Sequence, residues 1–160
     1  MSSQEILVDL MSEERLENAI RSNDLTLLQN LLSQGVEINH QNNDGNTVFH
    51  NAIRMDPHID ILKELLLNGS DVNIANKTHF TSIMFAISYG SDDFIYKLFA
   101  LDHIHLVNFD DTIENSLLHV LPTRSHLTES FMEALKDFQL DINTTNKFGD
   151  TPYSHNLQSV

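Results

Sequence analysis

The sequence predicts an all-α solenoid of stacked helix–turn–helix units that are joined by hairpin loops. Three observations lead to this fold class: a recurring pair of an apolar residue and asparagine, a recurring hydroxyl residue, and apolar residues at helical spacing between them. The pairs are Ile38-Asn39, Val72-Asn73, Val107-Asn108 and Ile142-Asn143, separated by 34, 35 and 35 residues. A fixed period of this length is typical of repeat architectures.

The hydroxyl residues follow the same period. They are Thr47, Thr81, Ser116 and Thr151, again separated by 34, 35 and 35 residues. A hydroxyl side chain can accept a hydrogen bond from a free backbone N–H group of the first helical turn, so each of these residues is expected to begin a helix. Because two unrelated features share one period, we interpret the chain as four repeats and the start of a fifth.

Each period holds two helices, and the second period shows this most clearly. After Thr47, apolar residues at helical spacing continue to Ile53, and the Asp56-Pro57 pair breaks the helix. Residues 59–66 carry the apolar face of the next helix, which ends near Gly69 because glycine can take the left-handed conformation of a C-terminal cap. One pair of helices cannot bury its apolar face alone, so neighbouring pairs must stack.

Two segments of the second repeat carry a family resemblance. Residues 44–52, DGNTVFHNA, are similar to the ankyrin signature D-x-x-G-x-T-P-L-H-x-A, with the first Asp shifted by one position. Residues 65–73, LLLNGSDVN, are similar to the family's L-L-x-x-G-A-D-V-N. The chain therefore resembles the ankyrin-repeat family, which implies a solenoid that works by binding other proteins.

The resemblance extends over most of the chain and sets the expected boundaries. We expect residues 1–11 to form an N-terminal extension or an extra helix, and residues 12–160 to form a single domain. The expected repeats are about 12–41, 42–75, 76–110 and 111–145, followed by a capping half-repeat at 146–160. The third repeat has His79 in place of the hairpin glycine, and in the fourth Pro122 falls where the first helix should continue.

Several family positions have roles that follow from their chemistry. Thr47 and the imidazole of His50 are expected to bridge the backbones of adjacent loops, and His119 is expected to have the same structural role in the fourth repeat. The asparagines of the recurring pairs are expected to hydrogen-bond loop backbone. Ala52 and Ala86 are small enough to let the two helices of a repeat approach closely.

Composition limits the functions that this chain can have. Its 160 residues contain no cysteine, which excludes a disulfide framework, a thiolate metal site and a cysteine nucleophile. The formal net charge is −14, from 9 basic and 23 acidic residues, and it opposes nucleic acids and anionic lipid surfaces. It favours a neutral or basic protein partner, although the same charge can simply keep a repeat protein soluble.

The N-terminal segment does not resemble a targeting or membrane segment. Its apolar residues are interrupted by acids, no basic stretch precedes them, and they fall short of the roughly 20 apolar residues of a membrane span. We therefore expect a cytoplasmic, monomeric protein that does not insert into membranes. Secretion into a host cell is compatible with these features, so a role as an effector stays open.

Motifs of the common enzyme classes are absent. The sequence has no G-x-S-x-G nucleophile elbow, no G-x-x-x-x-G-K-S/T phosphate loop, no H-E-x-x-H zinc motif and no dinucleotide glycine pattern. The best metal candidate is the His-Ile-His sequence at 103–105, but the sequence fixes no third ligand. The paired acids Asp92-Asp93 follow Ser91 at an expected helix start, where the helix dipole favours them. We predict a chain without catalytic residues, cofactor or metal.

In ankyrin-repeat proteins the partner usually docks on the concave face, which is formed by the hairpin tips and the exposed side of each repeat's first helix. Aligning the repeats selects the corresponding residues of this chain. They are Arg21, Asn43, Asp44, Asn46, Arg54, Met55, Lys77, Phe80, Ser88, Tyr89, Ile113, Asn115, Arg124, Lys147 and Phe148. Met55, Phe80, Tyr89 and Arg124 rank first, because such side chains dominate interfaces. An alternative for Phe80 and Phe148 is packing on a neighbouring hairpin.

Three function classes follow from the resemblance. A non-catalytic module that binds a partner protein leads. The second is an inhibitor that occludes a functional surface of its partner, since the chain is similar in size to small ankyrin inhibitors of cyclin-dependent kinases, although no inhibitory residue aligns. The third is a substrate of asparaginyl hydroxylases, because Asn39 and Asn73 each follow a leucine by eight residues, as modified sites in ankyrin proteins do.

Overall fold

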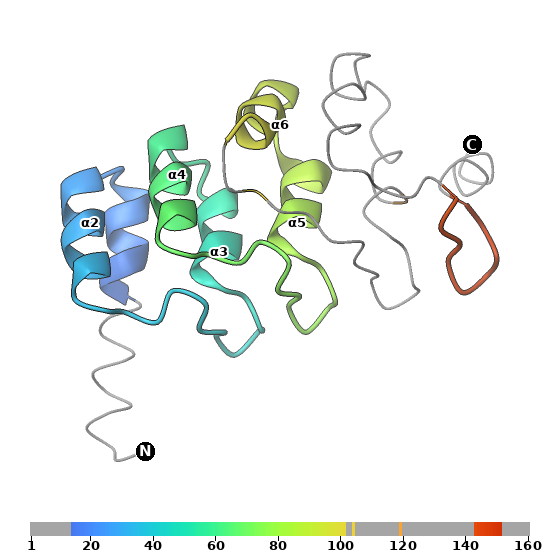
Figure 1. Ribbon diagram of the computed structural model, residues 1–160, viewed down its shortest axis with the longest axis horizontal. Helices are drawn as coiled ribbons and strands as arrows, with labels where there is room; N and C mark the ends of the chain where they lie inside the picture. Colours follow the sequence, from blue (N-terminus) through green and yellow to red (C-terminus); the bar gives the residue numbers. More distant parts are fainter. Residues whose placement is uncertain (1–13, 102–103, 105–118, 120–142, 152–160) are drawn as a thin grey trace.

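The computed structural model describes residues 14–101, 104, 119 and 143–151 of the chain (Figure 1). Within these residues a first helix covers 14–21, and it is followed by α2 (Leu25–Ser33), α3 (Val48–Arg54), α4 (Ile59–Leu67), α5 (Ser82–Tyr89) and α6 (Asp92–Phe99). The described part contains no strand, only an isolated antiparallel bridge between Ala75 and Thr81. The predicted all-α fold is confirmed.

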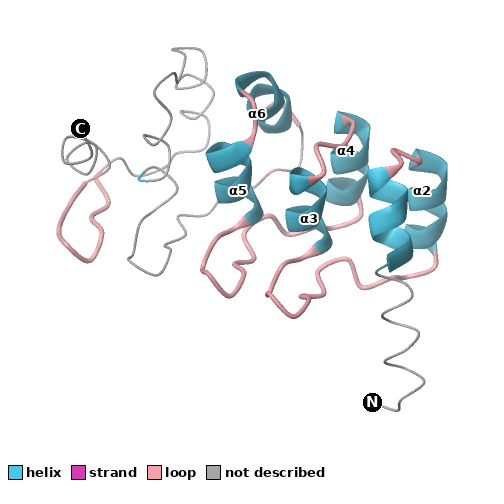
Figure 2. Cartoon of the chain, turned by 180° about the vertical axis from the view of Figure 1, so that it is seen from behind, coloured by secondary structure: helices cyan, strands magenta, loops and turns pink. Residues whose placement is uncertain are grey.

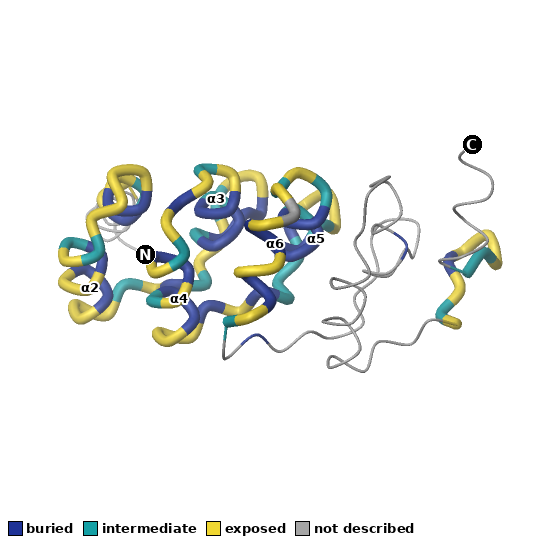
Figure 3. The backbone as a smooth tube through the Cα atoms, turned by 90° about the horizontal axis from the view of Figure 1, so that it is seen from above, coloured by how far each residue is buried: buried dark blue, intermediate teal, exposed yellow. Residues whose placement is uncertain are grey.

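The helices form two rows (Figures 1 and 3). We call the first helices of the repeats, 14–21, α3 and α5, the inner row, and the second helices, α2, α4 and α6, the outer row. Consecutive repeats contact each other along both rows: α3 contacts α5, α2 contacts α4, and α4 contacts α6. The hairpin loops all leave the same end of the stack (Figure 2). This is the solenoid of helix–turn–helix units that the period predicts.

Polar side chains cap the N-terminal ends of α2, α5 and α6. Thr81 Oγ1 accepts a hydrogen bond from the backbone N–H of Met84, and Ser91 Oγ accepts one from that of Phe94, both at 3.2 Å. These bonds satisfy N–H groups that have no partner inside the helix, so the helix starts predicted at Thr81 and Ser91 are confirmed. Asp24 caps α2 in the same way, a cap that the sequence period did not predict.

The ends of the helices also follow the predicted breaks. Gly35 and Gly69 follow α2 and α4 with φ of 79° and 89°, in the left-handed region where glycine has no Cβ penalty. α3 ends at Arg54, shortly before Asp56, whose φ of 49° is also left-handed, and Pro57. The chain therefore reverses between the two rows at the places where the sequence predicts turns.

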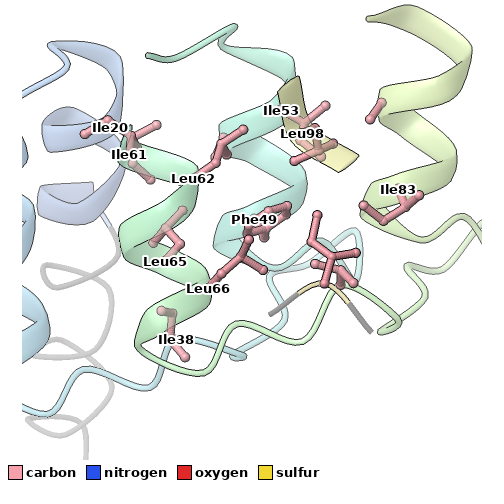
Figure 4. Close-up of a cluster of buried hydrophobic side chains, with 14 of the residues drawn as sticks. Ile20, Ile38, Phe49, Ile53, Ile61, Leu62, Leu65, Leu66, Ile83 and Leu98 are labelled. Carbon is pink, nitrogen blue, oxygen red and sulfur yellow. The ribbon is translucent and has the colours of Figure 1, made fainter. Parts of the chain in front are cut away.

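One apolar core runs through the described repeats (Figure 4). Large side chains from both rows are fully buried in it, among them Phe49 of α3 and Leu65 of α4. Burying each such side chain contributes about 1.5–3 kcal/mol. Ala52 and Ala86 have no exposed surface, as expected for small residues at close helix contacts.

Each described hairpin turns around an asparagine that the sequence analysis did not single out. The Oδ1 atoms of Asn42, Asn76 and Asn146 each accept two backbone N–H groups, two and four residues further on, at 2.9–3.0 Å. Asp111 holds the corresponding sequence position in the remaining repeat. A search for Asn or Asp with the repeat period would have found this set, because both side chains accept such bonds.

Neighbouring hairpins are tied together through their backbones. The N–H of Lys77 donates to the carbonyl oxygen of Asp44 at 3.0 Å. Gly45 lies at this close approach, and a Cβ there would be 2.7 Å from the nitrogen of Lys77. His79 takes the equivalent place in the next hairpin with a φ of 63°, so the departure from the family glycine leaves the left-handed turn unchanged.

Candidate protein-binding face

His50 ties the second repeat to the third. Its Nδ1 accepts a hydrogen bond from the backbone N–H of Thr47 at 3.1 Å, so Nε2 carries the proton and donates to the carbonyl oxygen of Phe80, also at 3.1 Å. Burial lowers the pKa of His50 below the ordinary imidazole value of 6.5, against a smaller upward effect of the bond to Phe80. The neutral imidazole joins two loops, which confirms the predicted structural role.

His119 repeats this arrangement. Its Nε2 lies 2.8 Å from the carbonyl oxygen of Asp150, and Asp150 precedes Thr151 as Phe80 precedes Thr81. The side chain is 1% exposed. This is the contact to the following hairpin that the bridging role of His119 predicts.

The inner face is the solvent-facing side of the inner row. Arg21, Met55 and Tyr89 hold the same position in three successive repeats, 34 residues apart. Arg21 is exposed, Met55 is half-buried against the core, and the side chain of Tyr89 is 77% exposed. These predicted binding residues therefore occupy corresponding places on neighbouring helices.

Aromatic rings gather around Phe85 of α5. Phe85 lies at the centre, with ring centroids 5.8 Å from Phe80 and 5.6 Å from Tyr89, and it also meets the His50 ring edge-on at 6.1 Å. Phe85 was not among the predicted binding residues. The signal was present, because Phe85 precedes Tyr89 by one helical turn and therefore shares its face.

A groove opens beside these rings, between the ends of α3 and α5 that lie away from the hairpins. Its volume is about 680 Å³. Its lining is mixed, since it includes apolar side chains such as Ile53 and Phe94 together with the charged side chains of Arg54 and Asp56. The lining residues are Ile53, Arg54, Asp56, Phe85, Tyr89, Gly90, Ser91 and Phe94. The groove thus brings the predicted residues Arg54 and Tyr89 together.

The hairpin-tip candidates differ in exposure. Asp44 and Lys77 are exposed, as predicted for a binding surface, whereas Phe80 is half-buried against Phe85. The prediction of Asn46 as a binding residue is wrong. Its side chain is 6% exposed, and its Oδ1 accepts a hydrogen bond from Asn76 Nδ2 at 2.9 Å, because a buried amide needs a partner.

The remaining candidates lie at other places. Asn43 is exposed and Ser88 is half-buried. Phe148 is 66% exposed, with Lys147 Nζ 5.2 Å from its ring centroid. Three further candidates lie outside the described residues. They are Ile113, Asn115 and Arg124.

Asn39 has the loop bonds predicted for the recurring asparagines. Its Nδ2 donates to the carbonyl oxygen of Gly69 at 2.9 Å, and its Oδ1 accepts from the N–H of Asp71 at 2.8 Å. Asn73 donates from Nδ2 to the carboxylate of Asp71 at 3.1 Å. Asn39 therefore links the first repeat to the second, and hydroxylation of Asn39 or Asn73 stays a prediction.

The described residues contain neither a cluster of metal-binding side chains nor a helix that could span a membrane. No three His, Asp or Glu side chains among them come close enough together to hold a metal ion. The histidines at 103 and 105 fall outside this part of the chain. In the same residues no helix has the length and apolar character needed to cross a bilayer.

Comparison with known proteins agrees with the repeat period. The family model for ankyrin repeats, in three copies, matches residues 16–110. The matched segment includes α2 to α6 and therefore the whole groove.

Three relatives were found among curated proteins. Two are probable serine/threonine-protein kinases of Dictyostelium discoideum. One is 34% identical over 83 residues, which are 48% of this chain and 9% of that protein. The other is 30% identical over 152 residues, which are 88% of this chain and 18% of that protein. A putative ankyrin repeat protein of fowlpox virus is 31% identical over 96 residues, 58% of this chain and 27% of that protein. This chain thus spans at most 27% of the length of these relatives.

Proposed function

Because the chain belongs to the ankyrin-repeat family, whose repeats are generally protein–protein interaction modules, we propose that it binds a partner protein through its inner face and catalyses no reaction. The observation that carries the proposal is the exposure of Tyr89, which is 77% exposed although its ring packs on Phe85 and it lines the groove. A large aromatic ring that is held in place and left open to solvent is typical of interface anchors.

The inner face has the side chains of an interface centre. Tyr, Phe, Met and Arg are enriched in such centres. Tyr89 and the half-buried Phe85 lie on α5, Arg54 ends α3, and the half-buried Met55 follows it. Because Phe85 already contacts the Tyr89 ring, ordering that ring on binding costs little conformational entropy. Truncating an anchor of this kind costs about 2 kcal/mol, which corresponds to roughly 30-fold in affinity.

We propose a neutral or basic protein as the partner. The net charge of −14 attracts basic surfaces at long range and speeds their encounter with the chain. The same charge opposes nucleic acids and anionic membranes. It also opposes association between copies of the chain, in agreement with a monomer.

The absence of catalysis is part of the proposal. Ankyrin repeats are typically not enzymes. The five glycines, at 35, 45, 69, 90 and 149, lie too far apart for the glycine-rich loop with which kinases cover ATP phosphates. The kinase names belong to relatives of which this chain spans 18% or less, and we propose that it corresponds to their repeats.

Affinity capture from a cell lysate tests the proposal, with the parent chain, Tyr89→Ala and Tyr96→Ala as baits. Tyr96 is the matched control, because it is also exposed (55%) but lies on α6 of the outer row. We expect a protein that the parent and Tyr96→Ala retain and Tyr89→Ala loses. A protein lost from Tyr96→Ala and retained by Tyr89→Ala would move the binding surface to the outer row and contradict the proposal. Circular dichroism checks that both variants fold.

A further inference from the structure

A series of ring contacts connects the buried His50 with the exposed Tyr89. The His50 side chain has no exposed surface, and its ring meets the half-buried Phe85 ring edge-on, with 6.1 Å between the centroids and 82° between the planes. Phe85 in turn contacts the rings of Phe80 at 5.8 Å and Tyr89 at 5.6 Å. The orientation of Tyr89 on the inner face therefore depends on Phe85, and Phe85 packs against His50.

His50 can support these rings because both of its nitrogens are bonded. Nδ1 accepts a hydrogen bond from the N–H of Thr47, and Nε2 donates one to the carbonyl oxygen of Phe80, each at 3.1 Å. Rotating the imidazole would break both bonds and leave buried polar groups without a partner, which is costly. Phe85 therefore packs against a ring of fixed orientation, and Phe80 is held both through its carbonyl oxygen and through its own ring.

The third repeat shows that a repeat can pack without this imidazole. Met84 holds the equivalent position, 34 residues after His50, and it is fully buried in the same core. A methionine side chain has no N–H group to donate and cannot bridge two loops as His50 does. An imidazole is therefore not a general requirement for packing at this position, and what it adds at position 50 is the support of Phe80 and Phe85.

We propose that His50 is a positioning residue of the binding face, which holds Phe85 in the orientation against which the Tyr89 ring packs. This inference rests on the proposed function of the inner face and adds a residue that is too deeply buried to touch the partner itself. The advantage for binding is entropic, because a ring that is ordered before the partner arrives loses less conformational freedom when it docks.

Fluorine NMR of the full chain, labelled with 3-fluorotyrosine, tests the positioning directly. The chain has three tyrosines, at 89, 96 and 153, and the variants Tyr89→Phe and Tyr96→Phe assign the first two resonances. In His50→Met we expect the Tyr89 resonance to move toward its position in the urea-unfolded chain, because the ring loses its fixed contact with Phe85. The Tyr96 resonance is expected to stay in place, because Tyr96 lies on α6 of the outer row.

His119→Met is the matched control. It replaces the equivalent histidine of the fourth repeat, whose Nε2 lies 2.8 Å from the carbonyl oxygen of Asp150. It is expected to leave the Tyr89 resonance unchanged. His50→Gln, which also lacks the imidazole ring, replaces His50→Met in these measurements if circular dichroism shows that the methionine variant does not fold. A Tyr89 resonance that stays unchanged in the folded His50 variant, or that moves as far in His119→Met, would overturn the inference.

The consequence for binding is measured with a peptide. A phage-displayed library of random linear peptides is selected on the immobilised full chain, and a peptide that Tyr89→Ala no longer binds is synthesised. Its affinity, measured by fluorescence anisotropy, is expected to fall about two- to tenfold in His50→Met, which is the cost of ordering one further side chain on binding. His119→Met is expected to bind the peptide as the parent does. An affinity that His50→Met leaves unchanged would also overturn the inference.

These variants separate the inference from the proposed function. If Tyr89→Ala loses the lysate protein while the His50 variants leave the Tyr89 resonance unchanged, only the role of His50 is wrong. If Tyr89→Ala changes neither the captured protein nor the selected peptides, the inner face itself is not the binding surface. The inference then fails together with the proposed function, even where the resonance moves.

Discussion

At His50 both ring nitrogens have fixed roles. Nδ1 accepts a hydrogen bond from the N–H of Thr47, and Nε2 donates one to the carbonyl oxygen of Phe80. A proton on Nδ1 would therefore place two N–H donors opposite each other and break the bond to Thr47. Burial is the main cause that holds the pKa of His50 below 6.5 in the folded chain, since a charged imidazole loses its hydration there, and the bond to Phe80 opposes it with a smaller upward effect.

The stability of the chain is therefore expected to depend on pH through His50. As the pH falls through 6.5, the unfolded chain takes up a proton at this residue before the folded chain does. The contribution of His50 to the free energy of unfolding is thus full above 6.5 and declines as the pH falls toward the lower folded-state pKa.

Urea unfolding of the parent and His50→Gln between about pH 5 and 8 measures this contribution. Glutamine does not titrate, and the other ionisable groups cancel in the difference. The parent's advantage over the variant is expected to shrink toward acid pH. A difference that stays constant, or grows toward acid pH, would contradict the assignment of a buried, neutral imidazole.

The sequence predicted single residues best where the backbone dictates the side chain. His50 and Gly69 have roles that follow from helix caps and loop bridging, and the structure confirms both. Asn46 was mispredicted, because its repeat position places it at a hairpin but does not reveal that it turns toward Asn76 of the next hairpin. Phe85 was missed because an apolar helical residue is more often core than surface.

At the scale of elements, the hairpins depend on left-handed residues that differ in their surroundings. Gly45 has a φ of 78° and a backbone neighbour, Lys77 N, 2.7 Å from where a Cβ would be. Gly69 has a φ of 89° and nothing within 4 Å of such a Cβ. Both glycines therefore need the left-handed conformation, but of the two only Gly45 also lacks room for a Cβ.

Gly45→Ala is expected to destabilise the chain more than Gly69→Ala does. Left-handed strain costs each variant about 1 kcal/mol, and Gly45→Ala additionally pushes two hairpin backbones apart. Denaturant unfolding of both variants measures the difference in free energy. Equal losses would show that the hairpins shift enough to accommodate a methyl group. The close approach at Gly45 would then contribute nothing to the free energy of unfolding.

Helix positions were largely predictable, and turn chemistry was not. The predicted break at Pro57 and the hydroxyl at Thr81 mark real helix boundaries. The turn-forming side chains of Asn42 and Asn76 escaped notice because asparagine is frequent throughout the chain and its role appears only when the loop bonds are known. The left-handed His79 shows that a loop can keep its shape without the family residue.

At the scale of the whole molecule, neighbouring repeats are coupled through side chains about one period apart. Asn51 Nδ2 donates to Glu17 Oε1 at 2.7 Å on the inner row, and Gln29 Nε2 donates to Glu64 Oε2 at 2.9 Å on the outer row. Stability in such a stack is approximately a sum over repeats and their interfaces. The groove exists only where two repeats meet, so its integrity depends on this stacking.

The period was enough to predict the solenoid but not the binding groove. Repeated residues at 34 or 35 spacing fix which helices are neighbours. The shape of the groove depends on which side chains of neighbouring repeats line it, such as Ile53 of α3 and Phe94 of α6, and no single-repeat pattern encodes that combination. Arg54, which lines the groove together with Phe85 and Tyr89, was nevertheless among the residues predicted for the binding face.

Photo-crosslinking in cells tests the central claim, that the inner face binds a protein, most directly. A photoreactive phenylalanine analogue replaces Tyr89 in one variant and Tyr96 in another, so that two exposed tyrosine positions report on the inner and outer rows. We predict a specific crosslink to a partner protein from position 89 and none to that protein from position 96. Crosslinks from position 96 without any from position 89 would contradict the claim.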